Sequence, residues 1–190
     1  MPVPTGVYLT PNHVGYLDIL VLASLTPVVF VSKHEVGTWP VFGWFARRCG
    51  TRFLRRAERR DLVRVGAELA PVLEAGVNLA VFLEGTSSDG RGVLPFKPSL
   101  LAPAVAEGWT VVPVALRFTT TAGIDPAERI AWWGDMTLPA HLVGFAGLPW
   151  VKAAVRWGEA MRAEGDRKEL AVRLQADVAR LLPGPEERMT

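Results

Sequence analysis

Short runs of β-branched and aromatic residues alternate with helix-like segments along this chain, and this alternation constrains the fold more than any other feature. The predicted strands are residues 7–10, 28–31, 50–54, 77–83, 110–116 and 153–157. The predicted helices are residues 16–25, 36–48, 61–75, 98–107 and 166–182. Asp61 is the expected cap of the third helix, and Gly76 is its expected stop. The alternation indicates an α/β fold with a largely parallel, mixed sheet flanked by helices.

The composition is that of a globular chain. Hydrophobic residues make up 49% of the 190 residues and charged residues 21%, which excludes an intrinsically disordered protein. With no repeat or linker in the sequence, we expect a single domain over residues 1–190. The longest apolar run, residues 19–31, contains Pro27 and is shorter than the roughly 20 residues that cross a bilayer. Cys49 is the single cysteine, which excludes an internal disulfide.

Seven arginines lie between residues 47 and 60, directly after an aromatic stretch at residues 39–45. Such a cluster suits phosphate, anionic lipid or nucleic acid, and the alternative is a solvated arginine face. Apolar and basic residues side by side are typical of a protein that lies on a membrane surface, although the same aromatic side chains also suit a core. No nucleic-acid partner is expected, because the net charge is only +2 and no helix-turn-helix, zinc or RNP-like motif is present.

His13 and Asp18 are the first candidates for chemistry. A histidine can take a proton from an alcohol, and a carboxylate can fix its tautomer and stabilise the imidazolium. A spacing of five residues brings the two together if His13 lies in a loop and Asp18 on the first turn of the following helix. Asn12 and Gly15 suit such a turn. The alternative is a surface histidine beside an unrelated helix-capping aspartate.

The context of this pair resembles the glycerolipid acyltransferases, the family of 1-acylglycerol-3-phosphate acyltransferases. Residues 13–18 (HVGYLD) resemble its HxxxxD motif. Lys33 lies before residues 40–43 (PVFG), as a basic residue does in the family. The remaining blocks follow in the family's order, as residues 50–56 (GTRFLRR), 82–88 (FLEGTSS) and 111–114 (VVPV). The resemblance implies the family's fold and covers about residues 7 to 160.

The resemblance implies an enzyme that transfers a fatty acyl group from an acyl thioester, of acyl carrier protein or coenzyme A, to a lysolipid hydroxyl. His13 is then the general base and Asp18 orients it, with no acyl-enzyme intermediate, no cofactor and no metal. Lys33, Arg56 and the turn residues Glu84, Gly85 and Thr86 would bind or position the acceptor. Glu84 and Gly85 have plainer alternatives, as a buried structural carboxylate and a turn glycine. We expect a peripheral protein on the cytoplasmic side of a membrane.

Two departures from the family pattern concern the acceptor. Leu83 replaces the third-motif proline, and Ser87 replaces an arginine that is expected to hold the acceptor phosphate. Either Arg91 substitutes for that arginine, or the acceptor differs. Residues 84–97 look like a bacterial subgroup that includes lyso-ornithine lipid acyltransferases, as do residues 133–136 (WGDM) and His141. His141 and His34 also have a purely structural interpretation.

A third departure concerns the N-terminus, because family members usually carry a hydrophobic segment ahead of the HxxxxD block, whereas Met1 lies just before that block here. Either the form is naturally short and the membrane segment is absent, or the chain is incomplete. A different class of function remains open, that of a non-catalytic membrane-binding module. The intact His13 and Asp18 pair disfavours it, since binding alone requires no such pair. A serine hydrolase is excluded by the lack of a G-x-S-x-G motif.

Overall fold

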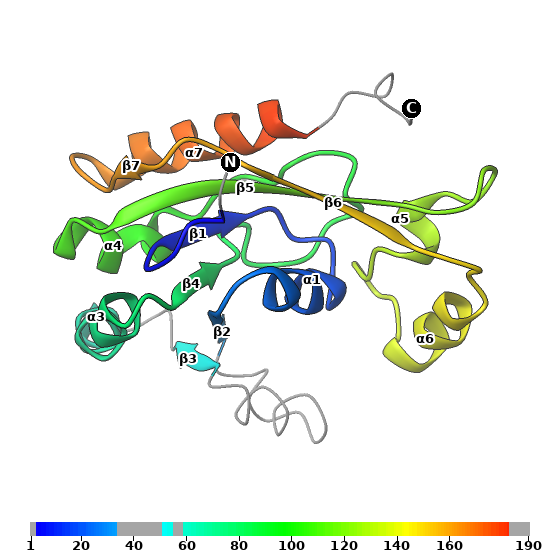
Figure 1. Cartoon of the computed structure of the whole chain (residues 1–190), viewed down its shortest axis with the longest axis horizontal. Helices are drawn as coiled ribbons and strands as arrows, with labels where there is room; N and C mark the ends of the chain where they lie inside the picture. Colours follow the sequence, from blue (N-terminus) through cyan, green and yellow to red (C-terminus); the bar gives the residue numbers. More distant parts are fainter. Residues whose placement is uncertain (1–2, 34–50, 55–58, 183–190) are drawn as a thin grey trace.

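The computed structural model describes residues 3–33, 51–54 and 59–182. Its strands are β1 (Tyr8–Pro11), β2 (Val28–Lys33), β3 (Arg52–Leu54), β4 (Asn78–Val81), β5 (Thr110–Thr119), β6 (Lys152–Trp157) and β7 (Met161–Arg162). Its helices are α1 (Leu17–Leu25), α3 (Arg59–Glu74), the 3-10 helix η2 (Pro98–Leu101), α4 (Ala102–Glu107), α5 (Pro126–Arg129), α6 (Leu138–Ala146) and α7 (Arg167–Leu181). Figure 1 shows helices on both faces of a central sheet.

The sheet has the order β3-β2-β4-β1-β5-β6, and β7 also pairs with β5. The strands β3, β2, β4, β1 and β5 are parallel to their neighbours. The strands β6 and β7 run antiparallel to β5. The largely parallel, mixed sheet predicted from the sequence is therefore confirmed.

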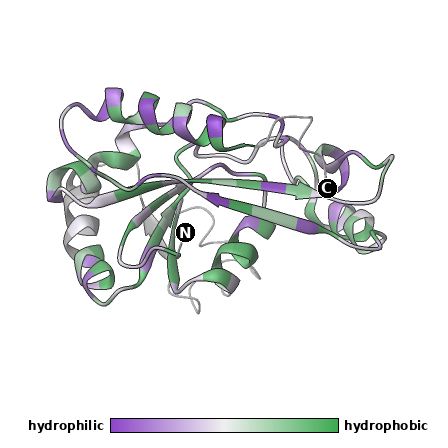
Figure 2. Ribbon diagram, turned by 45° about the horizontal axis from the view of Figure 1, so that its top comes forward, coloured by the Kyte–Doolittle hydropathy of each residue, from purple (hydrophilic) through white to green (hydrophobic). Residues whose placement is uncertain are grey.

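The central strands are mostly apolar, as expected for a sheet that is covered on both faces, although β1 contains Thr10 and β4 begins with Asn78, both of which are buried. On one face Leu69 of α3 and Leu174 of α7 pack into a core with Leu79 of β4. On the other face Leu22 of α1 packs with Leu9 of β1. In Figure 2 these strands are largely green, whereas α7 carries purple, hydrophilic residues as well. The two cores hold the carboxyl ends of β1 and β4 in fixed register.

Several element boundaries differ from the prediction. Helix α3 begins at Arg59, so Asp61 lies inside the helix and is not its cap. The predicted helix at 98–107 is a 3-10 turn followed by α4, with Pro103 near the start of the α-helical part. The prediction lacked α5, α6 and β7. Helix α5 has four residues and β7 has two, so neither is long enough to show a period, whereas α6 is a nine-residue apolar run without a clear polar face.

The predicted start of α7 and the predicted end of α3 are confirmed. Asp166 caps α7, where its side chain accepts hydrogen bonds from the backbone N–H groups of Lys168 and Glu169. Gly76 follows α3 with a φ of +77°, a conformation that favours glycine. The predicted helix at residues 36–48 lies outside the described residues. Across the described ranges, every helix is too short or too polar to traverse a bilayer.

Candidate active site

The candidate site lies at the carboxyl ends of β1 and β4, which are parallel neighbours. The chain leaves β1 at Pro11 and continues into Asn12 and His13, and it leaves β4 at Val81 and continues toward Glu84. Ligand sites of open α/β sheets form at this edge, because loops from adjacent strands converge there. The topology thus brings together two motifs that are separated by about 70 residues in sequence.

Asn12 fixes the loop that carries His13. Its side-chain amide donates to the carbonyl of Leu116 at 3.0 Å, and its carbonyl oxygen accepts from the Leu116 N–H at 2.7 Å. Asn12 is fully buried, so these two bonds tie the end of β1 to β5 in a dry environment. The sequence suggested Asn12 only as a turn residue, because its partner is 104 positions away.

His13 and Asp18 form the predicted pair. The Nδ1 atom of His13 lies 2.8 Å from Oδ2 of Asp18, whose side chain is fully buried, while 21% of the His13 side chain is exposed. A carboxylate only accepts, so Nδ1 donates and Nε2 carries the free lone pair. This is the tautomer in which a histidine acts as a base toward a hydroxyl.

Asp18 also organises the backbone of the motif. Its Oδ2 atom accepts from the N–H groups of Val14 at 2.7 Å and Gly15 at 3.0 Å, in addition to His13. Its Oδ1 atom is buried and has no hydrogen-bond partner among the described residues. One carboxylate oxygen therefore sets both the loop conformation and the histidine tautomer, which explains a spacing of five residues across a loop-to-helix junction.

An aromatic stack holds the imidazole ring from its face. The ring of His13 lies on Phe82 with centroids 3.9 Å apart and an angle of 19° between the planes. Phe82 stacks in turn with Phe30 of β2 at 6.3 Å. With Asp18 at its edge and Phe82 on its face, the His13 ring is held in one orientation.

Glu84 lies beneath His13 as a buried carboxylate. Its Oε1 atom accepts from the His13 N–H at 2.8 Å, and its Oε2 atom accepts from the Leu94 N–H at 3.1 Å. Burial raises the pKa of Glu84 to about 7, the two backbone hydrogen bonds oppose that shift, and Asp18 adds to it. Glu84 thus positions the His13 loop in this structure. Direct contact with an acceptor remains a prediction.

The turn after Glu84 also contacts the His13 loop. Gly85 has a φ of +73° and donates its N–H to the carbonyl of Phe82 at 3.0 Å, as a turn glycine does. Thr86 is exposed at this turn. Ser88, which sequence reasoning missed, donates its N–H to the His13 carbonyl at 2.9 Å. The loop that contains Glu84 therefore binds the His13 backbone at both its N–H and its carbonyl.

The segment ahead of α6 covers the other side of the motif. The Trp132 N–H donates to the Val14 carbonyl at 3.0 Å, and a Cβ on Gly15 would lie 3.1 Å from the Trp132 nitrogen. The Tyr16 hydroxyl lies 3.2 Å from Nδ1 of His141, a buried residue of α6. Burial lowers the pKa of His141. His141 thus supports the motif from α6, in line with its structural interpretation.

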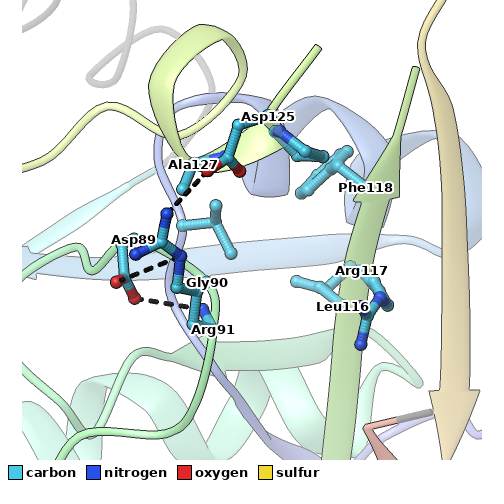
Figure 3. Close-up of a pocket in the computed structure, with 10 residues that line it drawn as sticks. Asp89, Gly90, Arg91, Leu116, Arg117, Phe118, Asp125 and Ala127 are labelled. Carbon is cyan, nitrogen blue, oxygen red and sulfur yellow. Dashed lines mark hydrogen bonds and ion pairs between the residues drawn. The ribbon is translucent and has the colours of Figure 1, made fainter. Parts of the chain in front are cut away.

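Three basic residues are predicted to bind the acceptor, and the structure describes the side chain of only one of them, Arg91. Arg91 forms an ion pair with Asp125 at 2.6 Å, and its Nε lies 4.0 Å from Asp89 (Figure 3). Lys33 is the last residue of β2, opposite Leu54 of β3, and its side chain lies outside the described part of the structure. Arg56 lies outside the described residues altogether. The structure therefore brings His13, Asp18, Glu84 and Gly85 together, with Thr86 exposed at the same turn. The binding roles expected of Lys33, Arg56, Arg91 and the turn residues stay predictions.

The described ranges contain no group of three or more His, Cys, Asp or Glu side chains that could hold a metal ion. The polar groups that converge on His13 are instead a carboxylate, a second buried carboxylate and backbone amides. Such an arrangement can take a proton from an alcohol and hold the resulting positive charge beside Asp18.

Comparison with known proteins identifies the family of the chain. The family model described as Acyltransferase matches residues 2–117. A lyso-ornithine lipid O-acyltransferase of Brucella abortus is 39% identical over 188 residues, covering 92% of this chain and 70% of that protein. A 1-acyl-sn-glycerol-3-phosphate acyltransferase of Neisseria gonorrhoeae is 38% identical over 139 residues, covering 73% of this chain and 54% of that protein. The chain thus spans between about half and 70% of the length of these two relatives.

A solved structure agrees with the fold. The 1-acyl-sn-glycerophosphate (LPA) acyltransferase PlsC of Thermotoga maritima superposes with a TM-score of 0.65 at 26% identity, covering 97% of this chain and 68% of that one. The family match covers more than half of the chain and includes His13, Asp18 and Glu84. The chain belongs to the acyltransferase family, with lysolipid acyltransferases of lipid biosynthesis among its relatives.

Proposed function

We propose that this chain transfers a fatty acyl group from an acyl thioester to the hydroxyl of a lysolipid. The hydrogen bond between His13 Nδ1 and the buried Asp18 carboxylate carries this proposal, because it leaves Nε2 as the base. The names of the relatives support acyl transfer to a lysolipid. A non-catalytic membrane-binding module would need neither the fixed tautomer of His13 nor the hydrogen bond from the His13 N–H to Glu84.

The side chains described above account for the proton transfers of this reaction. Nε2 of His13 takes the proton of the acceptor hydroxyl while that oxygen attacks the thioester carbonyl carbon. The carbon–sulfur bond then breaks, and the imidazolium returns its proton to the departing thiolate. Asp18 stabilises the imidazolium between these two steps, because its carboxylate lies 2.8 Å from Nδ1. Atoms and charges balance without an acyl-enzyme intermediate.

The donor in this proposal is acyl carrier protein or coenzyme A charged with a fatty acid. The acceptor is a lysolipid of one of two classes named by the relatives, 1-acylglycerol 3-phosphate or lyso-ornithine lipid. Ser87 offers no positive charge, and Arg91 is already paired with Asp125. These two observations favour the acceptor without a phosphate monoester.

The membrane is the proposed location of the acceptor, reached from the cytoplasmic side by peripheral association. Exposed apolar side chains on α1 and α6 support this placement, and they include Leu20, Leu25, Leu142 and Val143. Tyr16 connects the two helices, since its ring contacts both His141 and Phe145. The apolar surface therefore lies on the same elements that support the His13 loop.

The direct test is an acyl-transfer assay with purified protein and both donors, in which lysophosphatidate and lyso-ornithine lipid are compared. Wild-type protein should acylate at least one of them. His13→Ala should lower turnover by about 10² to 10⁴-fold, the usual contribution of a general base. Circular dichroism and the thermal midpoint of each variant show whether the fold is retained. Wild-type turnover by a folded His13→Ala protein would exclude the mechanism.

A further inference from the structure

A small pocket opens beside the His13 loop, between the turn that carries Arg91 and the carboxyl-terminal half of β5 (Figure 3). Its volume is about 90 Å³, and its walls include Val14, Arg91, Arg117 and Asp125. We propose that this pocket binds a zwitterionic acceptor headgroup, with the carboxylates at Asp125 and Asp89 holding an ammonium group and Arg91 holding a carboxylate. The inference rests on the proposed function, since it assumes a lysolipid acceptor.

The position of the pocket supports a role in acceptor binding. Val14 lines it and directly follows the base, His13. The turn that carries Arg91 contacts the same loop, because a Cβ on Gly90 would lie 3.2 Å from the Val14 side chain. Ser88 of that turn also donates to the His13 carbonyl. A headgroup in this pocket therefore lies against the two loops that hold the base.

The pocket carries charges of both signs. Arg91 contributes a positive charge, and Asp89 and Asp125 contribute two negative ones. The Arg91 and Asp125 pair is open to water, with 67% and 39% of the two side chains exposed. Exposed pairs of this kind contribute little to stability, so a ligand can separate them at small cost. A ligand with one charge of each sign then finds a partner for both.

A phosphate monoester fits the pocket less well. The pKa of Arg91 is raised by the hydrogen bond and charge of Asp125, and further by the charges of Asp89 and Glu128. A dianion that approached Arg91 would meet these three carboxylates, and Ser87 adds no positive charge. A zwitterion avoids this repulsion. Ornithine with one acylated amino group retains an ammonium and a carboxylate, which is the chemistry the pocket matches.

The test uses Asp125→Asn, which removes the charge but retains a side-chain oxygen to cap α5 at Ala127. Asp166→Asn is the matched control, because Asp166 caps α7 in the same way and does not line the pocket. For each protein, kcat and KM are measured with lyso-ornithine lipid and with lysophosphatidate, using one acyl thioester. Titration calorimetry with Nα-acetylornithine, with N-acetylnorvaline as the analogue that lacks the ammonium, reports headgroup binding without catalysis.

We expect Asp125→Asn to lower kcat/KM for lyso-ornithine lipid by about tenfold or more, mainly through KM, and to lower it less for lysophosphatidate. Asp166→Asn should leave the ratio of the two acceptors unchanged. Nα-acetylornithine should bind the wild type more tightly than Asp125→Asn, and N-acetylnorvaline should bind neither.

Equal losses on both acceptors, or equal binding of Nα-acetylornithine by wild type and Asp125→Asn, would overturn the pocket assignment while acyl transfer itself stands. Turnover of lysophosphatidate alone would also overturn it. If the wild type acylates neither lysolipid, the proposed function fails. In that case calorimetry still decides whether the pocket binds the headgroup analogue.

Discussion

Glu84 accepts the backbone N–H of His13 at 2.8 Å, although the two residues are 71 positions apart in sequence. The carboxylate of Glu84 is buried and uses its second oxygen for the Leu94 N–H at 3.1 Å. It thereby connects the base to the loop that follows β4. A residue of the third sequence motif thus determines where the base of the first motif lies.

Replacing Glu84 by Gln tests this connection. The amide can accept only one of the two N–H groups, and its NH₂ would face the other, which leaves a buried donor unpaired. We expect a loss of about 1–3 kcal/mol in the free energy of unfolding, measured by denaturant titration at about pH 5, where Glu84 is largely protonated, together with a fall in kcat. Glu74→Gln changes an exposed glutamate of α3 and should alter neither quantity. Wild-type kcat and stability in Glu84→Gln would contradict the positioning role.

The same residue predicts a pH dependence of stability. The pKa of Glu84 is raised from 4.5 to about 7 in the folded protein, chiefly by burial, so the folded state binds the proton more tightly than the unfolded state. This contribution is fully present below about pH 4.5 and is lost as the pH rises through about 7. The difference in unfolding free energy between wild type and Glu84→Gln should therefore shrink, or change sign, by a few kcal/mol across this window. A difference independent of pH would show that burial does not shift this carboxyl.

Asp18→Asn should separate the orientation of His13 from its presence. The variant keeps an oxygen for the N–H groups of Val14 and Gly15, but it loses the charge that stabilises the imidazolium and fixes the tautomer. We expect kcat to fall by at least about a hundredfold with a smaller change in KM. The pH–rate profile should also change, which a loss of folded protein alone would not produce. A variant with wild-type kcat would contradict the assigned role of Asp18.

Gly15→Ala tests the packing of the segment before α6 on the HxxxxD loop. The added methyl would lie 3.1 Å from the Trp132 nitrogen and 3.3 Å from its Cβ, so that segment has to move. Overpacking of this kind costs about 1–3 kcal/mol, and the shift should also lower kcat because Trp132 donates to Val14 beside the base. Gly92→Ala is the control, since a methyl added there would have no heavy atom of the described residues within 4 Å. Equal stability of the two variants would show that the contact is not tight.

The features predicted from sequence are those encoded by local pattern. The central strands are mostly runs of β-branched and aliphatic residues such as residues 111–116, all of which are buried in a sheet that is covered on both faces. The pairing of His13 with Asp18 follows from a short spacing and a recognised motif. The side-chain positions of Lys33 and Arg56 fall outside the described part of the structure, so their predicted binding roles stay predictions.

The features that sequence did not predict depend on distant partners. Asn12 pairs with Leu116 across 104 positions, and Arg91 pairs with Asp125 across 34, so neither partner is visible in a local window. Helix α6 lacks a clear polar face and resembles an apolar run, because His141 is its buried contact to Tyr16 while Val143 is exposed. Binary patterning fails for a helix whose outward face is apolar.

We expect the outward face of α6 to contact a membrane. Val143 of α6 has 77% of its surface exposed and Leu142 has 42%, on the helix that supports the HxxxxD loop. Burying such side chains at the headgroup boundary stabilises a peripheral protein on a bilayer. Val143→Glu should therefore weaken flotation with liposomes that contain anionic lipid.

Val172→Glu is the matched control, because Val172 is 68% exposed on α7, which packs on the other core of the sheet. Binding by the wild type should also weaken as salt rises, since basic residues contribute attraction to anionic lipid. Equal flotation of the two variants would place the membrane contact elsewhere on the chain, and flotation that is absent from the wild type would contradict peripheral membrane association.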